Sequence, residues 1–329
     1  MALQDFASQG GSFDLAIIAA TISILIGGIL YGVGLGFSLR NLRLLGAEEI
    51  GQGIISSAMV GALFAFTILL DSTVSSTVPQ DSLPHCPGVQ SPGESPHGFY
   101  SCNLRSLSLS FSNLSSQLSR SADIAGFSSS LELSVGVISA RPFFALESAS
   151  KSLSDASQIA AQNAALAHLE LQLSDAIRSS AMLILLPAGL LLRTFFATRK
   201  LGAAAMAIAI AAYAIYPLLF LYTFTVSDTL ATVSEAAQAS SGFNSEFASI
   251  PLMDLDETGA VRDTISDMSQ SDFGGRVQPL FPLSYRANSL AIADLVIHPL
   301  ISLVISAVAA LEFYAILSSP IFLPYSEKI

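Results

Sequence analysis

Three ionisable residues in one long apolar stretch near the end of the chain are its most informative polar groups. Asp294 and His298 are four residues apart, and Glu312 follows further along the same stretch. At 3.6 residues per turn, a helix would align all three on one face. Ionisable groups at membrane depth are costly and usually face protein or water. The pattern predicts either a functional stripe for ions or a polar polymer, or side chains that reach water at the two membrane interfaces. Pro299 predicts a kink with exposed carbonyls beside His298.

The chain has only two cysteines, Cys86 and Cys102, and they flank a Pro-rich segment. On an oxidising side of a membrane we expect them to form a disulfide. His85 and His97 lie beside them and permit a four-ligand zinc site as the alternative. Their spacing matches no specific zinc motif, so the disulfide is favoured.

No motif in the sequence names a reaction. There is no nucleophile elbow, Walker loop, zinc-protease helix, paired-cysteine metal motif or kinase motif. The glycines at 32–36 lie inside an apolar stretch with no preceding strand and do not predict a nucleotide loop. Asp254, Asp256 and Glu257 could offer oxygen ligands to calcium, but without the EF-hand pattern they favour a solvated acidic surface. We therefore expect no enzyme, no cofactor and no bound metal.

Composition predicts a protein that spans a membrane several times. The chain has 329 residues, of which 52% are hydrophobic and 12% are charged. One soluble core could not bury so much apolar surface. The net charge of −11 argues against a nucleic-acid surface built on a global basic field.

Five apolar stretches are long enough to cross a hydrocarbon layer about 30 Å thick. They are residues 15–37, 53–72, 179–197, 203–225 and 289–317. We expect an all-α polytopic protein with a mainly helical extracytoplasmic region. Its predicted parts are an N-terminal hairpin 1–72, a Ser/Ala-rich outer region with the disulfide loop 73–178, a second hairpin 179–225, an acidic outer region 226–288, and a last helix with a short tail 289–329.

The basic residues predict the orientation, because Lys and Arg in short loops stay on the cytoplasmic side. Six of the 14 basic residues fall in the short segments assigned to that side, namely Arg40, Arg43, Arg193, Arg199, Lys200 and Lys328. The two long polar regions are acidic. The N-terminus is therefore expected outside and the C-terminus in the cytoplasm of a multi-pass membrane protein.

Small residues indicate how the first two helices pack. Where no hydrophobic effect acts between helices, small side chains allow close approach of the backbones. Every fourth residue is small in two segments, which are Gly28, Gly32 and Gly36 in the first helix and Gly53, Ser57 and Gly61 in the second. We predict that these two faces meet in a hairpin.

The outer region 73–178 divides into three parts. Its Pro/Gly-rich head, 79–98, is expected to be loop. In the Ser-rich middle, the segment 104–118 permits a strand, but a helix is slightly favoured. The tail 143–178 has the mixture of an amphipathic helix, with Leu166, Leu169 and Leu173 among its apolar residues, and no breaker separates it from the third apolar stretch.

The segment 185–222 carries a resemblance to a known family. It contains Leu-Pro-Ala-Gly-Leu-Leu-Leu-Arg, then Arg-Thr-Phe-Phe-Ala-Thr-Arg-Lys-Leu-Gly, then an Ala-rich helix that ends in Ala-Ile-Tyr-Pro-Leu-Leu. This pattern resembles a helical hairpin of the TrbL-type polytopic subunits of type IV secretion and conjugation machines, including archaeal DNA-transfer relatives. The resemblance implies a channel or platform subunit that binds its own copies, other secretion subunits and a cytoplasmic ATPase. DNA would be met only as translocated substrate, and no catalytic residue carries over.

Two other classes stay open. One is a structural or adhesive membrane protein whose outer domain meets an external partner. The other is a small-solute transporter, which is disfavoured because the five stretches show no inverted repeat.

The predicted orientation can be tested by cysteine labelling. In a background without Cys86 and Cys102, cysteines at Ser38 and Thr198 should resist an impermeant maleimide in intact cells, whereas a cysteine at Ser271 should be labelled. Labelling of the first two and protection of the third would reverse the assigned orientation.

Overall fold

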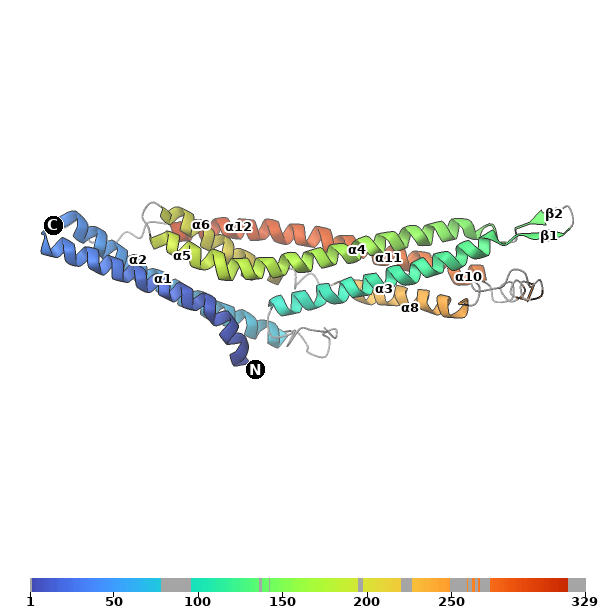
Figure 1. The fold of residues 1–329 in the computed structure, drawn as a ribbon, viewed down its shortest axis with the longest axis horizontal. Coiled ribbons are helices and arrows are strands. Elements are labelled where there is room, and N and C mark those ends of the chain that lie inside the picture. The colour runs from blue at the N-terminus through green and yellow to red at the C-terminus, as the bar shows by residue number, and fades with distance from the viewer. Residues whose placement is uncertain are drawn as a thin grey trace.

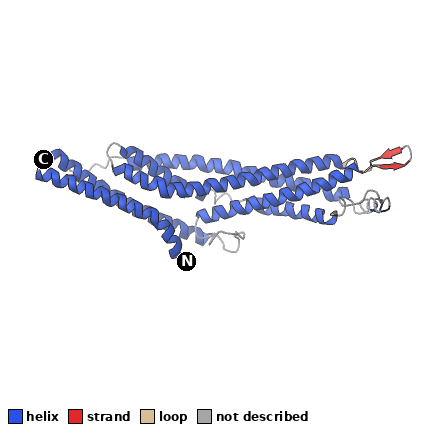
Figure 2. Ribbon diagram, in the orientation of Figure 1, coloured by secondary structure: helices blue, strands red, loops and turns tan. Residues whose placement is uncertain are grey.

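The computed structural model describes residues 2–77, 96–135, 138–141, 143–194, 198–219, 227–248 and 273–318, together with positions 259, 262, 263 and 266. These residues form an elongated helical molecule (Figure 1). The expected all-α architecture holds except for one short antiparallel hairpin at one tip, β1 (Leu133–Val135) paired with β2 (Ile138–Ala140) (Figure 2).

One half of the molecule is a serine-rich bundle. Its helices are α3 (Pro96–Ser130), α4 (Leu146–Ser180), α8 (Thr229–Glu246), α10 (Phe273–Val277) and α11 (Leu280–Ile292). Leu104, Leu107, Phe111, Leu114 and Leu118 recur on α3 at alternating steps of three and four and are fully buried. This spacing is that of a coiled-coil seam, so one stripe of α3 faces its partners along its whole length.

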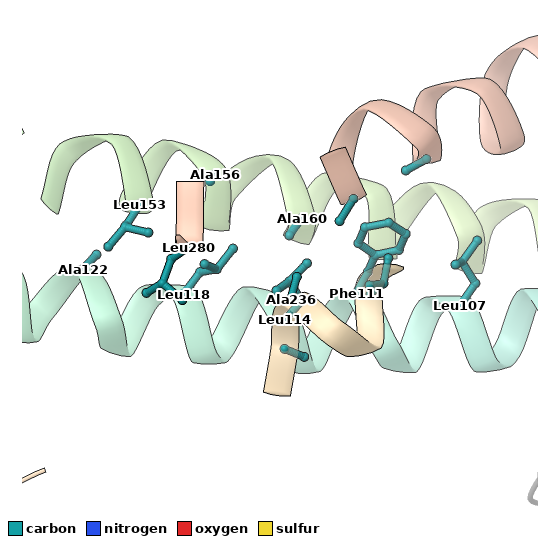
Figure 3. Packing of buried hydrophobic residues seen from close by; sticks show 14 of the residues in the cluster. Leu107, Phe111, Leu114, Leu118, Ala122, Leu153, Ala156, Ala160, Ala236 and Leu280 are labelled. Atoms are coloured by element: carbon teal, nitrogen blue, oxygen red, sulfur yellow. The ribbon is translucent and has the colours of Figure 1, made fainter. Parts of the chain in front are cut away.

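Helix α4 packs mainly small side chains against this stripe of α3. Its buried positions include Leu153, Ala156, Ala160 and Ala167, again at steps of three and four or their sum. Large residues of α3 thereby fit over alanines of α4, with Ala236 of α8 and Leu280 of α11 closing the core (Figure 3). Because alanine holds the backbones close, serine hydroxyls bond across to the neighbouring helix.

These crossing hydrogen bonds explain the many serines. The Ser108 hydroxyl donates to the Ala164 carbonyl at 3.1 Å, and the Ser157 hydroxyl donates to the Ser115 carbonyl at 2.9 Å. The Ser150 hydroxyl donates to the Ala122 carbonyl at 2.8 Å. Each bond satisfies a serine that the seam would otherwise bury without a partner.

The other half is an apolar bundle. It contains α1 (Ala2–Gly36), α2 (Arg40–Thr77), α5 (Leu186–Thr194), α6 (Arg199–Ile210) and α12 (His298–Ser318). Residues of α5 and α6 form its core with Leu317 of α12, and α1 packs on α5. Arg199 of α6 pairs with Glu48 of α2 at 2.9 Å and lies 3.9 Å from Glu49. Burial raises the pKa of Glu49, and the charge of Arg199 partly offsets that rise.

Three of the paths between the two halves contain a π-helical turn. These turns are η2 (Ala181–Leu185) between α4 and α5, η4 (Ala211–Ile215) after α6, and η6 (Ala293–Ile297) between α11 and α12. In each, the residue that follows donates its N–H to the carbonyl five positions earlier, as Leu186 does to Ala181, Tyr216 to Ala211 and His298 to Ala293.

A proline is the second residue after each of these turns, at Pro187, Pro217 and Pro299. A proline ring clashes with the carbonyl four residues earlier, and a turn widened by one residue relieves the clash. The disturbance predicted at Pro299 is therefore a π-turn, and the same rule applies at the other two positions. The turn η2 packs on η4, and α4 packs on both η4 and η6, so the three turns gather at one level.

Two described helices are long and apolar enough to cross a membrane. They are Arg199–Leu219 and Phe273–Ser318, and the segment Thr21–Gly36 is apolar but shorter. Two of the five predicted crossings thus meet this criterion. The other three, in α1, α2 and η2–α5, stay predictions.

The predicted α1–α2 hairpin forms, but through other glycines. A methyl group at Gly34 would lie 2.6 Å from the Arg43 nitrogen, and one at Gly46 would lie 2.4 Å from the Tyr31 nitrogen. Gly27 and Gly53 are similarly tight. By contrast, methyl groups at Gly28, Gly32, Gly36 and Gly61 would meet no atom within 4 Å, and Ser57 is exposed.

The packing prediction was therefore right for Gly53 and wrong for the other five positions. The contact follows glycines seven residues apart, 27 with 34 and 46 with 53, which is the seam repeat of two antiparallel helices. Gly28, Gly32 and Gly36, which are spaced four residues apart, lie instead on the face of α1 where an added methyl group would meet no atom within 4 Å.

Four further predictions concern the serine-rich bundle, two of them right and two wrong in part. The segment 104–118 is helical, as favoured, and α4 continues without a break through η2 into α5, as predicted. The expected loop 79–98 is wrong at its end, because α3 begins at Pro96, where a proline suits the first helical turn; the rest of that loop lies outside the described residues. Leu166, Leu169 and Leu173, taken as apolar positions of an amphipathic α4, are exposed by 40%, 63% and 51%.

The glycine seam makes a paired prediction about stability. Gly46→Ala should destabilise the protein by about 1–3 kcal/mol, because the added methyl group forces the two backbones apart. Gly32→Ala should be neutral or stabilising by up to about 1 kcal/mol, since alanine favours helix and meets nothing there. Thermal unfolding of the two detergent-solubilised variants measures the difference. Equal destabilisation by both would contradict the assigned seam.

Candidate functional site

Buried polar groups gather where the two halves of the molecule meet, and we call this cluster the junction. Asp294 in η6 is 2% exposed. Its carboxylate accepts a 2.6 Å hydrogen bond from the Ser227 hydroxyl and lies 3.1 Å from Nδ1 of His298. The imidazole is 28% exposed and links the buried carboxylate to the surface of the molecule. The predicted pairing of Asp294 with His298 on one face is thus present.

Glu312 does not belong to the junction. It lies in α12 and is exposed. The predicted three-residue stripe therefore separates into a buried pair, Asp294 and His298, and a surface carboxylate that contacts neither.

A second buried acid, Glu170 of α4, completes the junction. Only 7% of its surface is exposed, and it follows Ala160 and Ala167 along the α4 seam. Neither carboxylate oxygen has a hydrogen-bond partner among the described residues. Tyr100 of α3 and Tyr216, which follows η4, lie beside it and are 1% and 6% exposed.

Aromatic rings enclose this acid on the side of α3. The rings of Tyr100 and Tyr216 meet edge to face with centroids 6.2 Å apart. His97 packs at 5.8 Å from the ring of Tyr213 in η4, and its Nδ1 lies 3.2 Å from the Ser174 hydroxyl of α4. The first turn of α3 is thereby fixed against α4 and η4 together.

Burial controls the titration of these groups. It raises the pKa of Glu170 to about 8, the interaction with the Tyr100 hydroxyl partly offsets the rise, and the charge of Asp294 adds to it. Burial also raises the pKa of the Tyr100 phenol, as does the negative charge of Glu170. A carboxyl group that titrates near neutrality can accept or release a proton under physiological conditions.

Two buried asparagine side chains, Asn163 and Asn288, are hydrogen-bonded to each other near the junction. Asn163 of α4 donates from Nδ2 to Oδ1 of Asn288 in α11 at 3.1 Å. Asn288 in turn donates to the Ala156 carbonyl at 3.2 Å. Paired amides of this kind fix the axial position of α11 against α4, and hence that of η6 and Asp294.

The structure describes only one of the two cysteines. Cys102 is fully buried and is not a free thiol, whereas Cys86 and His85 lie outside the described residues, so the disulfide between Cys86 and Cys102 stays a prediction. The described part of the chain has no group of three or more His, Cys, Asp or Glu side chains suited to a metal ion. The acidic segment at Asp254 is also outside the described residues.

A small open groove lies between α3 and α8 on the serine-rich bundle. It encloses about 230 Å³ and is lined by polar residues such as Ser110, Asn113, Gln117 and Gln238. None of its lining residues is charged or aromatic. The groove therefore offers hydrogen bonds but no acid, base or nucleophile.

No family model matches this chain, and neither a curated protein nor a solved structure does. The resemblance of the segment 185–222 to TrbL-type subunits accordingly stands on its residue pattern alone.

Sequence reasoning found Asp294 and His298 but missed Glu170, Tyr100 and Tyr216. The apolar residues of α4 did not separate its buried face from the exposed Leu166, Leu169 and Leu173, and they gave no indication of a buried acid at Glu170. One signal could have identified it. The steps of three and four through Leu153, Ala156, Ala160 and Ala167 reach Glu170 next, whereas they leave the leucines outside.

The separation of the stripe can be tested by two matched substitutions in one continuous helix. Asp294→Ala should destabilise the protein by about 2 kcal/mol or more, because it leaves Ser227 and His298 without a buried partner. Glu312→Ala should change stability by less than about 0.5 kcal/mol, because the side chain is exposed. Chemical unfolding in detergent measures both. Equal effects would refute the division.

Proposed function

We propose that this chain is a non-enzymatic, membrane-embedded subunit of a larger assembly, acting as a channel or platform component of a secretion or DNA-transfer apparatus. The apolar bundle would lie in the cell membrane with five crossings, the N-terminus outside and the C-terminus in the cytoplasm. The serine-rich bundle would project outside. Further copies, other subunits and a cytoplasmic ATPase would be its partners, and DNA would be at most the transported substrate.

The observation that carries the proposal is an uncovered apolar stripe on the serine-rich bundle. Leu166, Leu169 and Leu173 lie at steps of three and four on the outer face of α4. They alternate with His168, Gln172 and Asp175, so this face is not suited to lipid. An exposed leucine seam of coiled-coil spacing favours a helix of another subunit as its cover.

Two features support the membrane arrangement. The α1–α2 and α5–α6 turns point to the same end of the molecule (Figure 1), and the basic residues Arg40, Arg43, Arg199 and Lys200 lie at or beside these turns. The uncovered glycines Gly28, Gly32 and Gly36 leave one small-residue face of α1 for another helix in the bilayer.

The alternative is a structural or adhesive protein whose outer bundle meets an external partner. The projecting β1–β2 hairpin at the tip of the serine-rich bundle is the observation that favours it. A small-solute transporter stays third.

Gene deletion with matched complementation tests the proposal. Loss of the gene should abolish DNA or protein transfer, and the wild-type gene and Ser154→Glu should restore it. Leu169→Glu should fail to restore transfer while still inserting in the membrane, because a charge at the centre of the leucine seam opposes subunit contact. Ser154 is an exposed polar position on the same helix and controls for added charge.

Normal transfer in the deletion strain would remove the secretion proposal and favour the adhesive alternative. Equal rescue by both variants would keep a transfer role but remove the leucine seam as a subunit contact. Disulfide crosslinking through Leu169→Cys, with Ser154→Cys as the control, reports the same contact directly.

A further inference from the structure

Glu170 occupies a place in the fold where an ionised carboxylate is unfavourable. It is 7% exposed, on the face of α4 that also carries Leu153, Ala160, Ala167 and the amide-paired Asn163. Among the described residues, its oxygens meet no charged donor: the neutral Tyr100 hydroxyl interacts with the carboxyl group, and no lysine or arginine pairs with it. An isolated buried carboxylate costs several kcal/mol, so such a group takes up a positive charge or opens to water.

We propose that Glu170 is a proton-binding site, and that loss of its proton opens the contact between the serine-rich bundle and the apolar bundle. The carboxylate takes one proton from hydronium. An O–H bond of hydronium breaks as the carboxyl O–H bond forms, a water molecule is left, and no electron is transferred. This inference does not depend on the transfer function proposed above.

A proton suits this site better than a metal ion. A metal ion requires several oxygen ligands around it. The described residues place no second carboxylate, histidine or cysteine with Glu170 in a metal-binding group. The oxygens near the carboxyl group are the phenol hydroxyls of Tyr100 and Tyr216, whereas a hard cation takes carboxylates, carbonyls and waters. A proton needs only one of the carboxyl oxygens.

The charged and titratable groups around Glu170 come from every helix packed on it. Tyr100 and His97 come from α3, and Tyr216 follows η4. Asp294 comes from η6 and is itself paired with His298. None of these groups brings a fixed positive charge to Glu170, while Asp294 can bring a negative one.

The location of Glu170 explains why its charge would matter for the fold. It lies on α4 about three helical turns before η2 begins at Ala181, and it interacts with groups from both halves of the molecule. Water can reach an ionised Glu170 only if α3, η4 or η6 moves away from α4. π-Turns at these places leave backbone carbonyls that can exchange partners without unwinding a whole helix.

The direction of the pH effect follows from the raised pKa. The closed junction holds the proton up to pH about 8, whereas an opened, solvated Glu170 would lose it at an ordinary carboxyl pKa of 4.5. The closed state is therefore most stable below the ordinary value and loses stability as the pH rises toward about 8. The opening equilibrium should increase by up to about tenfold per pH unit in this window and level off above it.

Amide hydrogen exchange of the full chain in lipid nanodiscs tests this dependence. After correction for the intrinsic exchange rate, opening at the end of α4 and in η4 should follow that profile in the wild type. In Glu170→Gln it should stay constant, because the amide mimics the protonated acid. Glu147→Gln, which alters an exposed acid of the same helix, should keep the wild-type profile.

Two further measurements keep the proposal falsifiable if Glu170→Gln folds poorly. Infrared spectra of the wild type should contain a protonated-carboxyl stretch that disappears as the pH passes about 8. Tyr100→Phe should move both transitions to higher pH, because the Tyr100 hydroxyl lowers the pKa of Glu170.

Identical exchange profiles for the wild type and Glu170→Gln would overturn the proposal, as would the absence of the protonated-carboxyl stretch. A third contrary result is also defined. If replacement of sodium by choline at constant ionic strength moves the transition, a metal ion and not a proton occupies the site.

Discussion

The structure depends on one uninterrupted helical path from Leu146 to Thr194, through α4, η2 and α5. On this path the partner-facing residues are small in the serine-rich bundle and aliphatic in the apolar bundle. Ala156 and Ala160 receive the large side chains of α3, whereas Leu186 and Leu190 form the core with α6. Because the helix does not stop between them, the two bundles are joined by continuous helical backbone at this point. The proline at 187 and its π-turn are the only change in helical geometry along that path within the described residues.

Much of this architecture could be predicted from the sequence. The apolar stretches, the helical middle of the outer region and the passage of its last helix into the third stretch all follow from hydropathy and the absence of breakers. The predictions were wrong where a helix has two faces that could each be the buried one. Leucines normally mark the buried face, but on α4 alanines face α3 because α3 already supplies the bulky side chains. The prediction for the glycines of α1 failed for a similar reason. This helix carries glycines spaced four apart and glycines spaced seven apart, and the sequence of α1 alone does not show which set contacts α2.

The site illustrates the same limit. Asp294 and His298 could be paired from spacing alone, because both belong to one helix. Glu170, Tyr100 and Tyr216 are brought together by three separate segments, and no local pattern relates them. The three prolines are a signal that the sequence does contain. Each is the second residue after a π-turn, and these turns pack at the level where the buried acids lie.

The central claim is that a water-exposed serine-rich bundle and a lipid-embedded apolar bundle meet at the junction along one continuous helix. Spin labels placed singly at Lys151, Ser154, Ile184 and Leu191 would test it most directly, because all four side chains are exposed on that helical path. In lipid vesicles, the labels at 151 and 154 should collide with a water-soluble nickel chelate, and those at 184 and 191 should collide with dissolved oxygen instead. Access of the nickel chelate to all four positions would contradict the account.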